Sequence, residues 1–270
     1  MPELPEVETT CRGIAPFITA KVIQAVVLRH TQLRYPLSVD LHLLHGQRFL
    51  SVVRRGKYLL FETERRHFVL MHLGMSGSLR LVTLQTPLQK HDHVDIVFDD
   101  NTVLRYHDPR RFGLWLWLGA NPQHPLLANL GPEPLSDRFN GAYVFQATRT
   151  TKVALKKWLM NSAAVVGVGN IYANEALFLA KLLPQRMAQT LTLVEAKRLV
   201  LQVQAVLSQA IAVGGTTLKD FVGSDGKPGY FAFNLQAYGR GGLECGCCQA
   251  LLTEIRLDNR TTVYCQQCQR

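Results

Sequence analysis

The chain has 270 residues, of which 47% are hydrophobic and 19% are charged. This composition is ordinary for a globular protein with a buried core, and it excludes an intrinsically disordered or fibrous chain. The formal net charge of +10 favours a polyanionic partner, most simply nucleic acid, over the alternative of a merely basic soluble enzyme. The sequence has no apolar run of about 20 residues and no signal peptide, so we expect a cytoplasmic protein without a membrane partner.

Residues 1–120 are predicted to form a β-rich domain with one leading helix. A short helix is expected over residues 5–16, because Val7, Cys11 and Ile14 recur at helical spacing. Eight later segments are short, rich in aliphatic and aromatic residues, and separated by glycine, aspartate, asparagine or charged clusters, as the strands of an antiparallel sandwich would be. These segments are residues 21–28, 48–54, 58–62, 68–73, 78–82, 94–98, 102–106 and 114–118.

The middle of the chain is predicted to be helical. Proline and glycine recur at residues 121–135, which indicates a linker, and a helical domain is expected over residues 136–235. Thr192 and Glu195 form a T-x-x-E capping box ahead of a long helix, and Gly214 and Gly215 should end that helix. The loop at residues 216–229 carries several glycines and is expected to be mobile.

Four cysteines near the C-terminus form two C-x2-C pairs, Cys245 with Cys248 and Cys265 with Cys268, with sixteen residues between the pairs. Two such turns present four thiolates, which is the ligand set of a structural tetrahedral zinc ion with no coordination position left for substrate. Two redox pairs or disulfides are the alternative, which is disfavoured because both spacings match a zinc site and two further cysteines are left over. Cys247 lies between two ligands, at a spacing that is wrong for a turn-held pair.

The segment between the two pairs has the length of a hairpin. We therefore expect residues 236–270 to form a small zinc-finger hairpin that holds one structural Zn²⁺ ion. From composition and pattern alone, the chain is a basic α+β protein with a β domain, a helical domain and a zinc hairpin. An enzyme and a DNA-binding module are equally compatible with those features.

Motifs spread along the whole chain, in one order, resemble the formamidopyrimidine-DNA glycosylase family. They are M-P-E-L-P-E-V-E at residues 1–8, R-G-K-Y at 55–58, H-L-G-M-S-G at 72–77, K-H-D-H at 90–93, D-P-R-R-F-G at 108–113, G-V-G-N-I-Y at 167–172, the loop at 216–230 and the two cysteine pairs. So many separated matches are not explained by chance. The resemblance implies an N-terminal β-sandwich, a helix-two-turn-helix domain and a C-terminal zinc finger.

The resemblance also implies an activity and a partner. Members of this family are bifunctional glycosylases and lyases that remove oxidised purines, chiefly 8-oxoguanine and formamidopyrimidines, and then cut the strand by β,δ-elimination. The implied partner is damaged double-stranded DNA, bound between the domains by a monomer that acts on the bacterial nucleoid.

Four catalytic residues follow from the resemblance. Pro2 becomes the chain terminus once Met1 is removed, and its secondary amine would attack the sugar C1′ to form an iminium ion. Glu3 matches the family's proton-transfer residue. Lys57 matches a lysine that contacts the phosphate beside the lesion, and Arg260 an arginine that grips phosphates and assists δ-elimination. Without the resemblance, these would be an ordinary second residue, a helix-start carboxylate and two surface cations.

Further residues match the family's DNA contacts. An enzyme that flips a base out of the stack must fill the hole that the base leaves. Met75, Arg110 and Phe112 match three void-filling residues, with Arg110 facing the orphaned cytosine; alone, Met75 and Phe112 would be taken for core residues. Other expected DNA contacts are His72, His91, Lys152, Lys156 and Asn170, although an asparagine in a turn is commonplace.

Two rival functions stay open on the sequence. One is an endonuclease VIII-type glycosylase, which has the same fold but prefers oxidised pyrimidines; Leu4 and the Arg110–Phe112 pair favour the purine enzyme. The other is a non-catalytic DNA-binding zinc protein that has kept the fold. Substrate preference distinguishes the first rival from an oxidised-purine glycosylase. Trapping of an iminium intermediate distinguishes the second rival from an enzyme.

Overall fold

The computed structural model describes residues 1–215 and 235–270, so the predicted loop at residues 216–229 lies outside the described residues. The chain divides into two compact units. Unit 1 comprises Met1–Ala128 with Val213–Tyr230, and unit 2 comprises Asn129–Ala212 with Phe231–Arg270. Among the described residues that follow the long helix, residues 213–215 belong to unit 1.

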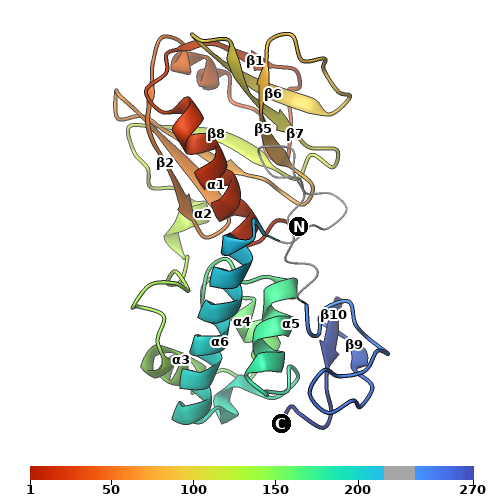
Figure 1. The fold of residues 1–270 in the computed structure, drawn as a ribbon. Coiled ribbons are helices and arrows are strands. Elements are labelled where there is room, and N and C mark those ends of the chain that lie inside the picture. The colour runs from red at the N-terminus through yellow and green to blue at the C-terminus, as the bar shows by residue number, and fades with distance from the viewer. Residues whose placement is uncertain (216–234) are drawn as a thin grey trace. The chain divides into compact units, whose positions relative to one another are not determined.

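Unit 1 is a two-sheet sandwich with one leading helix, α1 (Leu4–Ile18) (Figure 1). Both sheets are four-stranded and antiparallel, with strand orders β1-β6-β7-β5 and β2-β3-β4-β8. All eight predicted strands are present, with ends that differ by one or two residues: β1 (Ile23–Leu28), β2 (Phe49–Arg55), β3 (Tyr58–Thr63), β4 (Phe68–His72), β5 (Ser78–Thr83), β6 (Asp92–Phe98), β7 (Thr102–His107) and β8 (Leu114–Gly119). The sandwich prediction is therefore confirmed.

The core of unit 1 joins α1 to the facing sides of the sheets. Leu4, Ile14 and Ile18 of the helix are fully buried, and they belong to the same side of α1 as Val7 and Cys11. Strand β6 is buried along its whole length, as a strand covered on both faces must be. Two short helices were not predicted: a 3-10 helix η1 (Val39–Leu44), and α2 (Pro125–Ala128) inside the expected linker.

Unit 2 contains the predicted long helix, several shorter helices and the C-terminal hairpin. The helices are α3 (Gly141–Thr148), α4 (Leu155–Leu159), α5 (Asn170–Leu179), η2 (Ala188–Thr190) and α6 (Leu193–Ala212). The capping box is confirmed: the Thr192 backbone N–H donates to Glu195 Oε2 over 2.9 Å, and the Glu195 N–H donates to Thr192 Oγ1 over 3.2 Å. Gly214 and Gly215 follow the end of α6 with φ of +82° and +84°, the left-handed conformation that glycine adopts without strain.

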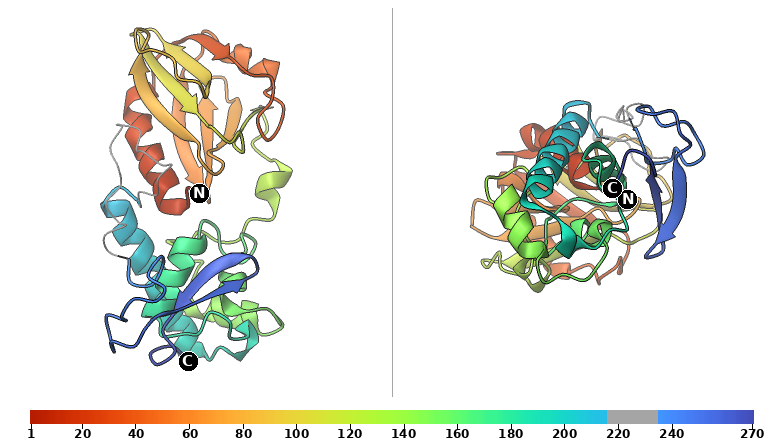
Figure 2. Two further views of the ribbon diagram at one scale, coloured as in Figure 1. Left: turned by 90° about the vertical axis from the view of Figure 1, so that its right-hand side faces the viewer. Right: turned by 90° about the horizontal axis from the view of Figure 1, so that it is seen from below.

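The predicted hairpin is also confirmed, as β9 (Thr253–Leu257) and β10 (Arg260–Tyr264). Asp258 and Asn259 form its two-residue turn, both with positive φ, which matches the twist of a two-stranded ribbon. Strand β10 lies beside α5, as the views in Figures 1 and 2 show. This contact places the start of β10 next to the helices of unit 2.

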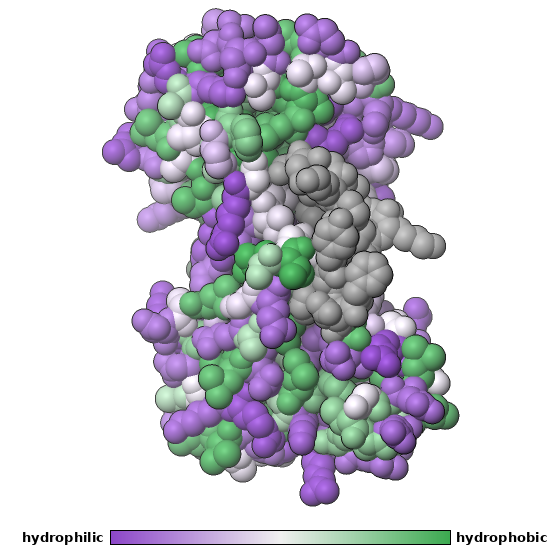
Figure 3. All heavy atoms as spheres, viewed as in Figure 1, coloured by the Kyte–Doolittle hydropathy of each residue, from purple (hydrophilic) through white to green (hydrophobic). Residues whose placement is uncertain are grey.

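Hydrophilic residues are spread over the face of each unit that Figure 3 shows. Among the described residues, none of the helices combines the length and apolar character that a membrane crossing requires.

Candidate functional site

The start of α1 holds the N-terminal residues of unit 1 in place. Pro2 is buried, and Glu3 is only 2% exposed. The Glu3 backbone N–H donates to Glu6 Oε2 over 2.8 Å, so the first turn of the helix is closed by its own carboxylate. Gly215 lies against this turn with a φ of +84°, and a Cβ there would come within 3.1 Å of Glu6 Oε1. A larger residue at Gly215 would therefore press on the turn that carries Pro2 and Glu3.

An ion pair ties α1 to the turn that carries Lys57. This turn, Gly56-Lys57, joins β2 to β3. Arg54 Nε donates to Glu8 Oε2 of α1 over 2.7 Å, and Arg54 also donates to the Gly56 carbonyl oxygen over 3.0 Å. Burial of Glu8 opposes ionisation, but the hydrogen bonds from Arg54 and Arg12 outweigh burial and lower the pKa of Glu8. Arg54 therefore links the segment that carries Pro2 to the backbone beside Lys57.

His72 ends strand β4, with its ring 4.9 Å from the ring of Tyr58 on the neighbouring strand. The Gly74 backbone N–H donates to His72 Nδ1 over 2.9 Å, so Nδ1 is the acceptor and Nε2 carries the proton. Burial, reinforced by the positive charge of Lys57, lowers the pKa of His72 to about 4. At neutral pH this side chain can therefore offer a phosphate an uncharged N–H donor.

His72 is an expected DNA contact, and from this pKa we predict that its contribution to DNA affinity does not change with pH near neutrality. His72→Gln keeps an uncharged donor, so we expect the ratio of wild-type to variant affinity to stay constant between about pH 6 and 8. Fluorescence anisotropy with an abasic-site duplex at fixed salt measures that ratio. A cationic His72 would instead make the ratio grow as the pH falls through this range. His42→Gln, on η1, is the control for nonspecific effects.

The three expected void-filling residues lie on two loops that touch. Met75 follows β4, and Arg110 and Phe112 follow β7. The Arg110 guanidinium lies 5.0 Å from the centre of the Phe112 ring. Gly74, with a φ of +77°, packs so closely that a Cβ would come within 2.5 Å of the Phe112 carbonyl carbon and 2.4 Å of the Gly113 nitrogen. Only glycine allows these loops to meet.

A buried carboxylate, which sequence reasoning gave no role, holds both loops. Asp108 is fully buried. Its Oδ1 accepts from the Ser76 hydroxyl over 2.8 Å and from the Arg110 backbone N–H over 3.2 Å. Its Oδ2 accepts from the Tyr106 hydroxyl and the Gly113 backbone N–H, both over 2.9 Å. Burial raises the pKa of Tyr106 well above its usual value, and the nearby Asp108 charge adds to this, so the phenol stays a donor.

Two histidines hold the backbone of the same loop. The Asp108 N–H donates to the His91 carbonyl oxygen over 3.0 Å, and the His93 ring Nε2 lies 2.9 Å from the Asp108 carbonyl oxygen. The ring of His91, an expected DNA contact, lies 5.9 Å from the ring of His107. Burial lowers the pKa of His93, which keeps this ring neutral. The structure thus gathers His72, Met75, His91, Arg110 and Phe112 around the loops next to Asp108.

Asp108→Asn should disorder this arrangement without removing its bulk. An amide has one acceptor oxygen where the carboxylate has two, so one pair of buried donors would face an NH₂ group. We expect a loss of about 1–3 kcal/mol in unfolding free energy and a weaker preference for cytosine opposite the lesion. Chemical denaturation and cleavage of duplexes with each opposite base measure the two effects. Asp99→Asn, at an exposed turn, should change neither.

In unit 2, two of the expected DNA contacts bind the hairpin. Lys156 is only 2% exposed, and its ammonium group donates to the Thr261 carbonyl oxygen over 2.9 Å and to Thr262 Oγ1 over 2.7 Å. Asn170 Nδ2 donates to the same Thr261 oxygen over 3.1 Å. Lys152 is exposed beyond the end of α3. The role of Lys156 at DNA stays a prediction. In this structure its ammonium group binds the two residues of β10 that follow Arg260.

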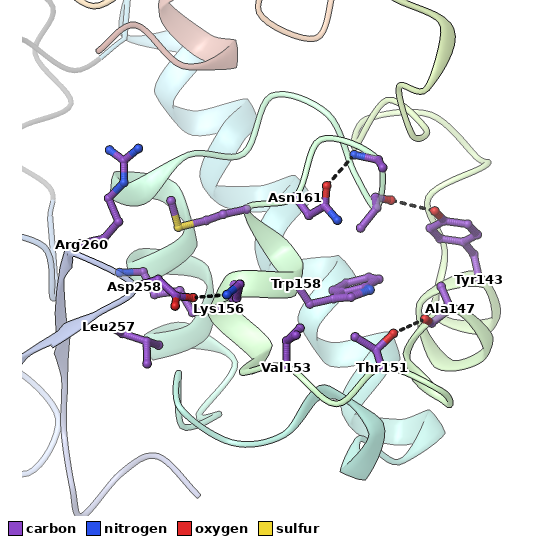
Figure 4. Close-up of a pocket in the computed structure, with 14 residues that line it drawn as sticks. Tyr143, Ala147, Thr151, Val153, Lys156, Trp158, Asn161, Leu257, Asp258 and Arg260 are labelled. Atoms are coloured by element: carbon purple, nitrogen blue, oxygen red, sulfur yellow. Dashed lines mark hydrogen bonds and ion pairs between the residues drawn. The ribbon is translucent and has the colours of Figure 1, made fainter.

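Arg260 is exposed at the start of β10 and lines a pocket of about 620 Å³ within unit 2. In Figure 4, Arg260 and Asp258 lie on the hairpin side of this pocket, while Tyr143 lies on the α3 side. Lys157 Nζ lies 3.1 Å from Asp258 Oδ2, and both side chains are about half exposed. Such an exposed ion pair adds little stability.

The four cysteines of the two C-x2-C pairs converge, with all Sγ atoms within 4.8 Å of one another. Tetrahedral coordination at about 2.3 Å requires sulfur–sulfur separations of about 3.8 Å. Cys245 and Cys268 are 3.9 Å apart, and Cys248 and Cys265 are 3.4 Å apart. The Cys247 N–H donates to Cys245 Sγ over 3.4 Å, as backbone amides do toward metal thiolates. These four residues are positioned to bind a metal ion, and the Cys247 side chain is not part of the cluster.

Two family models match the chain. The formamidopyrimidine-DNA glycosylase N-terminal domain matches residues 1–115, and the H2TH domain of the same enzymes matches residues 130–222. The sandwich, the helical unit and the four-cysteine hairpin therefore define the class as a DNA glycosylase of the H2TH type.

The chain belongs to the formamidopyrimidine-DNA glycosylase family. It is 56% identical to the formamidopyrimidine-DNA glycosylase of Teredinibacter turnerae, with 100% of both chains covered. Its structure is similar to that of the MutM (Fpg) protein from Thermus thermophilus, with a TM-score of 0.89 and 40% sequence identity. The match covers 99% of this chain and 98% of the Thermus chain. It is also similar to a Lactococcus lactis Fpg variant in complex with Fapy-dG-containing DNA, with a TM-score of 0.93, 32% identity and complete coverage of both chains.

Proposed function

We propose that this chain is a base-excision repair enzyme that removes oxidised purines from duplex DNA and then cleaves the strand. Full-length membership of the family is the observation that carries the proposal. The relative from Lactococcus lactis holds Fapy-dG-containing DNA, which supports a ring-opened purine as one substrate. The net charge of +10 supports a polyanionic partner.

The chemistry we propose starts at Pro2 after removal of Met1. The Pro2 nitrogen forms a bond to C1′ as the glycosidic bond breaks, and the electron pair of that bond leaves with the base. The sugar ring then opens, its oxygen takes up a proton, and an iminium ion results. This cation draws electrons from the C2′–H bond, so the bond to the 3′ phosphate breaks by β-elimination. Glu3, at the same helix start, carries protons in these steps.

The remaining residues bind the substrate in this proposal. Lys57 and Arg260 contact phosphates near the lesion, and Arg260 assists δ-elimination of the second phosphate. Further phosphate or base contacts come from His72, His91, Lys152, Lys156 and Asn170. Met75, Arg110 and Phe112 fill the space of the flipped nucleotide, and the contact between their two loops supports a joint role.

We propose zinc as the metal of the four-cysteine site. The donor set supports it, because four thiolates in a closed tetrahedron suit Zn²⁺. When bound, the ion supplies folding energy to the hairpin and takes no part in the reaction. We further propose that the protein works as a monomer on DNA in the cytoplasm.

A duplex panel tests the substrate class. We expect faster strand cleavage at 8-oxoguanine and formamidopyrimidine than at thymine glycol, with products that end in phosphate on both sides of the gap. Single-turnover rates with each lesion opposite cytosine or adenine provide the measurement. A higher rate at thymine glycol would assign the chain to oxidised pyrimidines, and the absence of cleavage at every lesion would leave a DNA-binding protein.

A further inference from the structure

Strand β10 has one edge paired with β9, and its other edge meets the helices of unit 2. A two-stranded hairpin is marginally stable by itself, and an unpaired strand edge leaves polar backbone groups without partners. Here, side chains supply hydrogen-bond partners for two backbone groups of that edge. Thr261 and Val263 point their backbone groups to the same side, and the Thr261 carbonyl oxygen accepts from Lys156 and Asn170. The Val263 N–H also finds a side-chain acceptor.

That acceptor is Asn174, a residue of α5 that is only 1% exposed. The Val263 N–H donates to Asn174 Oδ1 over 2.8 Å, and Asn174 Nδ2 donates to the Asn170 carbonyl oxygen over 2.6 Å. Both ends of the amide have a partner of the opposite kind, so the direction of the amide is determined. One end of Asn174 thus holds α5, and the other end holds β10.

Arg260 precedes the two anchored residues on this strand. The anchors lie at Thr261 and Val263, one and three residues after Arg260, whereas the turn at Asp258 and Asn259 is exposed. The exposed turn of the hairpin does not fix the position of Arg260 relative to α5. The contacts on the buried edge can, because a shift of β10 along α5 would break the hydrogen bond to Asn174.

We propose that Asn174 is a positioning residue for Arg260, acting by holding the register of β10 against α5. The inference rests on the proposed function, in which Arg260 grips phosphates and assists δ-elimination. Asn174 is too buried to reach DNA, so it acts through the two segments that it holds, β10 at Val263 and the start of α5 at Asn170. Loss of this anchor should misplace Arg260 even when the metal stays bound.

The neighbouring residue supplies a matched control. Glu175 is also 1% exposed, and its carboxylate accepts from the backbone N–H groups of Gln236, Ala237 and Tyr238 over 2.7–2.9 Å. It anchors the same C-terminal module from the same helix, but these hydrogen bonds fall at residues 236–238, ahead of the hairpin strands. Glu175→Gln therefore weakens the module's attachment while the anchors of β10 beside Arg260 are kept.

The test is a double-mutant cycle of Asn174→Leu and Arg260→Ala on the metal-loaded, Met1-free protein. We expect Asn174→Leu to keep one metal ion per chain, to bind an abasic-site duplex about ten- to a hundred-fold more weakly, and to reduce the salt slope by roughly one phosphate contact. The share of product that stops at β-elimination should rise. The double variant should be no worse than Arg260→Ala alone, because both changes disable the same contact.

Independent, multiplicative effects of the two substitutions would overturn the inference, as would a Glu175→Gln variant with the same loss of salt slope. Asn174→Asp, which keeps an acceptor for the Val263 N–H, should restore most of the slope. If Asn174→Leu does not fold, Asn174→Ser, which is too short to reach Val263, is measured in the same way with the same expected result. Cleavage of 8-oxoguanine by the wild type is scored separately, so failure of the cycle alone leaves the proposed function standing.

Discussion

Blocking the nitrogen of Pro2 is expected to abolish covalent trapping and strand cleavage. With Met1 or any extension attached, that nitrogen is part of a peptide bond and has no free electron pair for attack on C1′. Pro2 is buried at the start of α1, so the blocked nitrogen stays where the fold holds it and the loss is chemical. We expect the rate of lesion cleavage to fall on the order of 1,000-fold or more, as it does when other covalent enzymes lose their nucleophile.

Borohydride reduction on an 8-oxoguanine duplex provides the measurement, because only an iminium ion is converted to a stable crosslink. The sharpest design adds a short N-terminal extension that a protease removes to leave Pro2 first. The uncut protein should bind DNA but give no crosslink, and the cut protein should regain it. An equal yield of crosslink before and after cutting would place the nucleophile elsewhere. An intact mass shows which form is present.

Removal of the metal from the four-cysteine site is the second change with a large expected effect. The buried core beneath the hairpin is small, and Cys245 and Cys265 themselves are part of it. Without the ion, the four cysteines are free thiols and the metal–sulfur bonds are lost. The module then lacks the folding free energy that metal binding contributes. We expect the hairpin to lose its ordered structure and DNA affinity to fall at least about ten-fold, because Arg260 loses its place.

Chelation followed by metal analysis, circular dichroism and fluorescence anisotropy measures these effects, and added Zn²⁺ should reverse them. Cys247→Ser is the control, since the Cys247 side chain lies outside the cluster and the variant should bind one metal ion and DNA as the wild type does. Unchanged DNA affinity after verified metal loss would show that the side-chain anchors from α4 and α5 hold the hairpin without the ion.

Local patterns predicted the strands and the long helix of the fold. Short segments rich in aliphatic and aromatic residues, bounded by turn residues or charged clusters, predicted all eight strands of unit 1. Thr192 with Glu195 predicted the start of α6. These signals depend on residues close together in the chain. The same kind of reasoning missed η1 and α2, which are short and lack a periodic apolar pattern. It also did not anticipate that Gly215 packs against Glu6, because that contact joins residues far apart in the chain.

By itself the sequence determined the family, through motifs spread along the whole chain, and the four cysteines that come together as a possible metal site. Only the tertiary structure decided what holds those groups. Asp108 meets Ser76 across thirty-two residues, and Asn174 meets Val263 across eighty-nine. Sequence patterns do not identify such residues as partners. A buried hydrogen bond depends on where two distant segments pack, and not on the residue spacing within either segment.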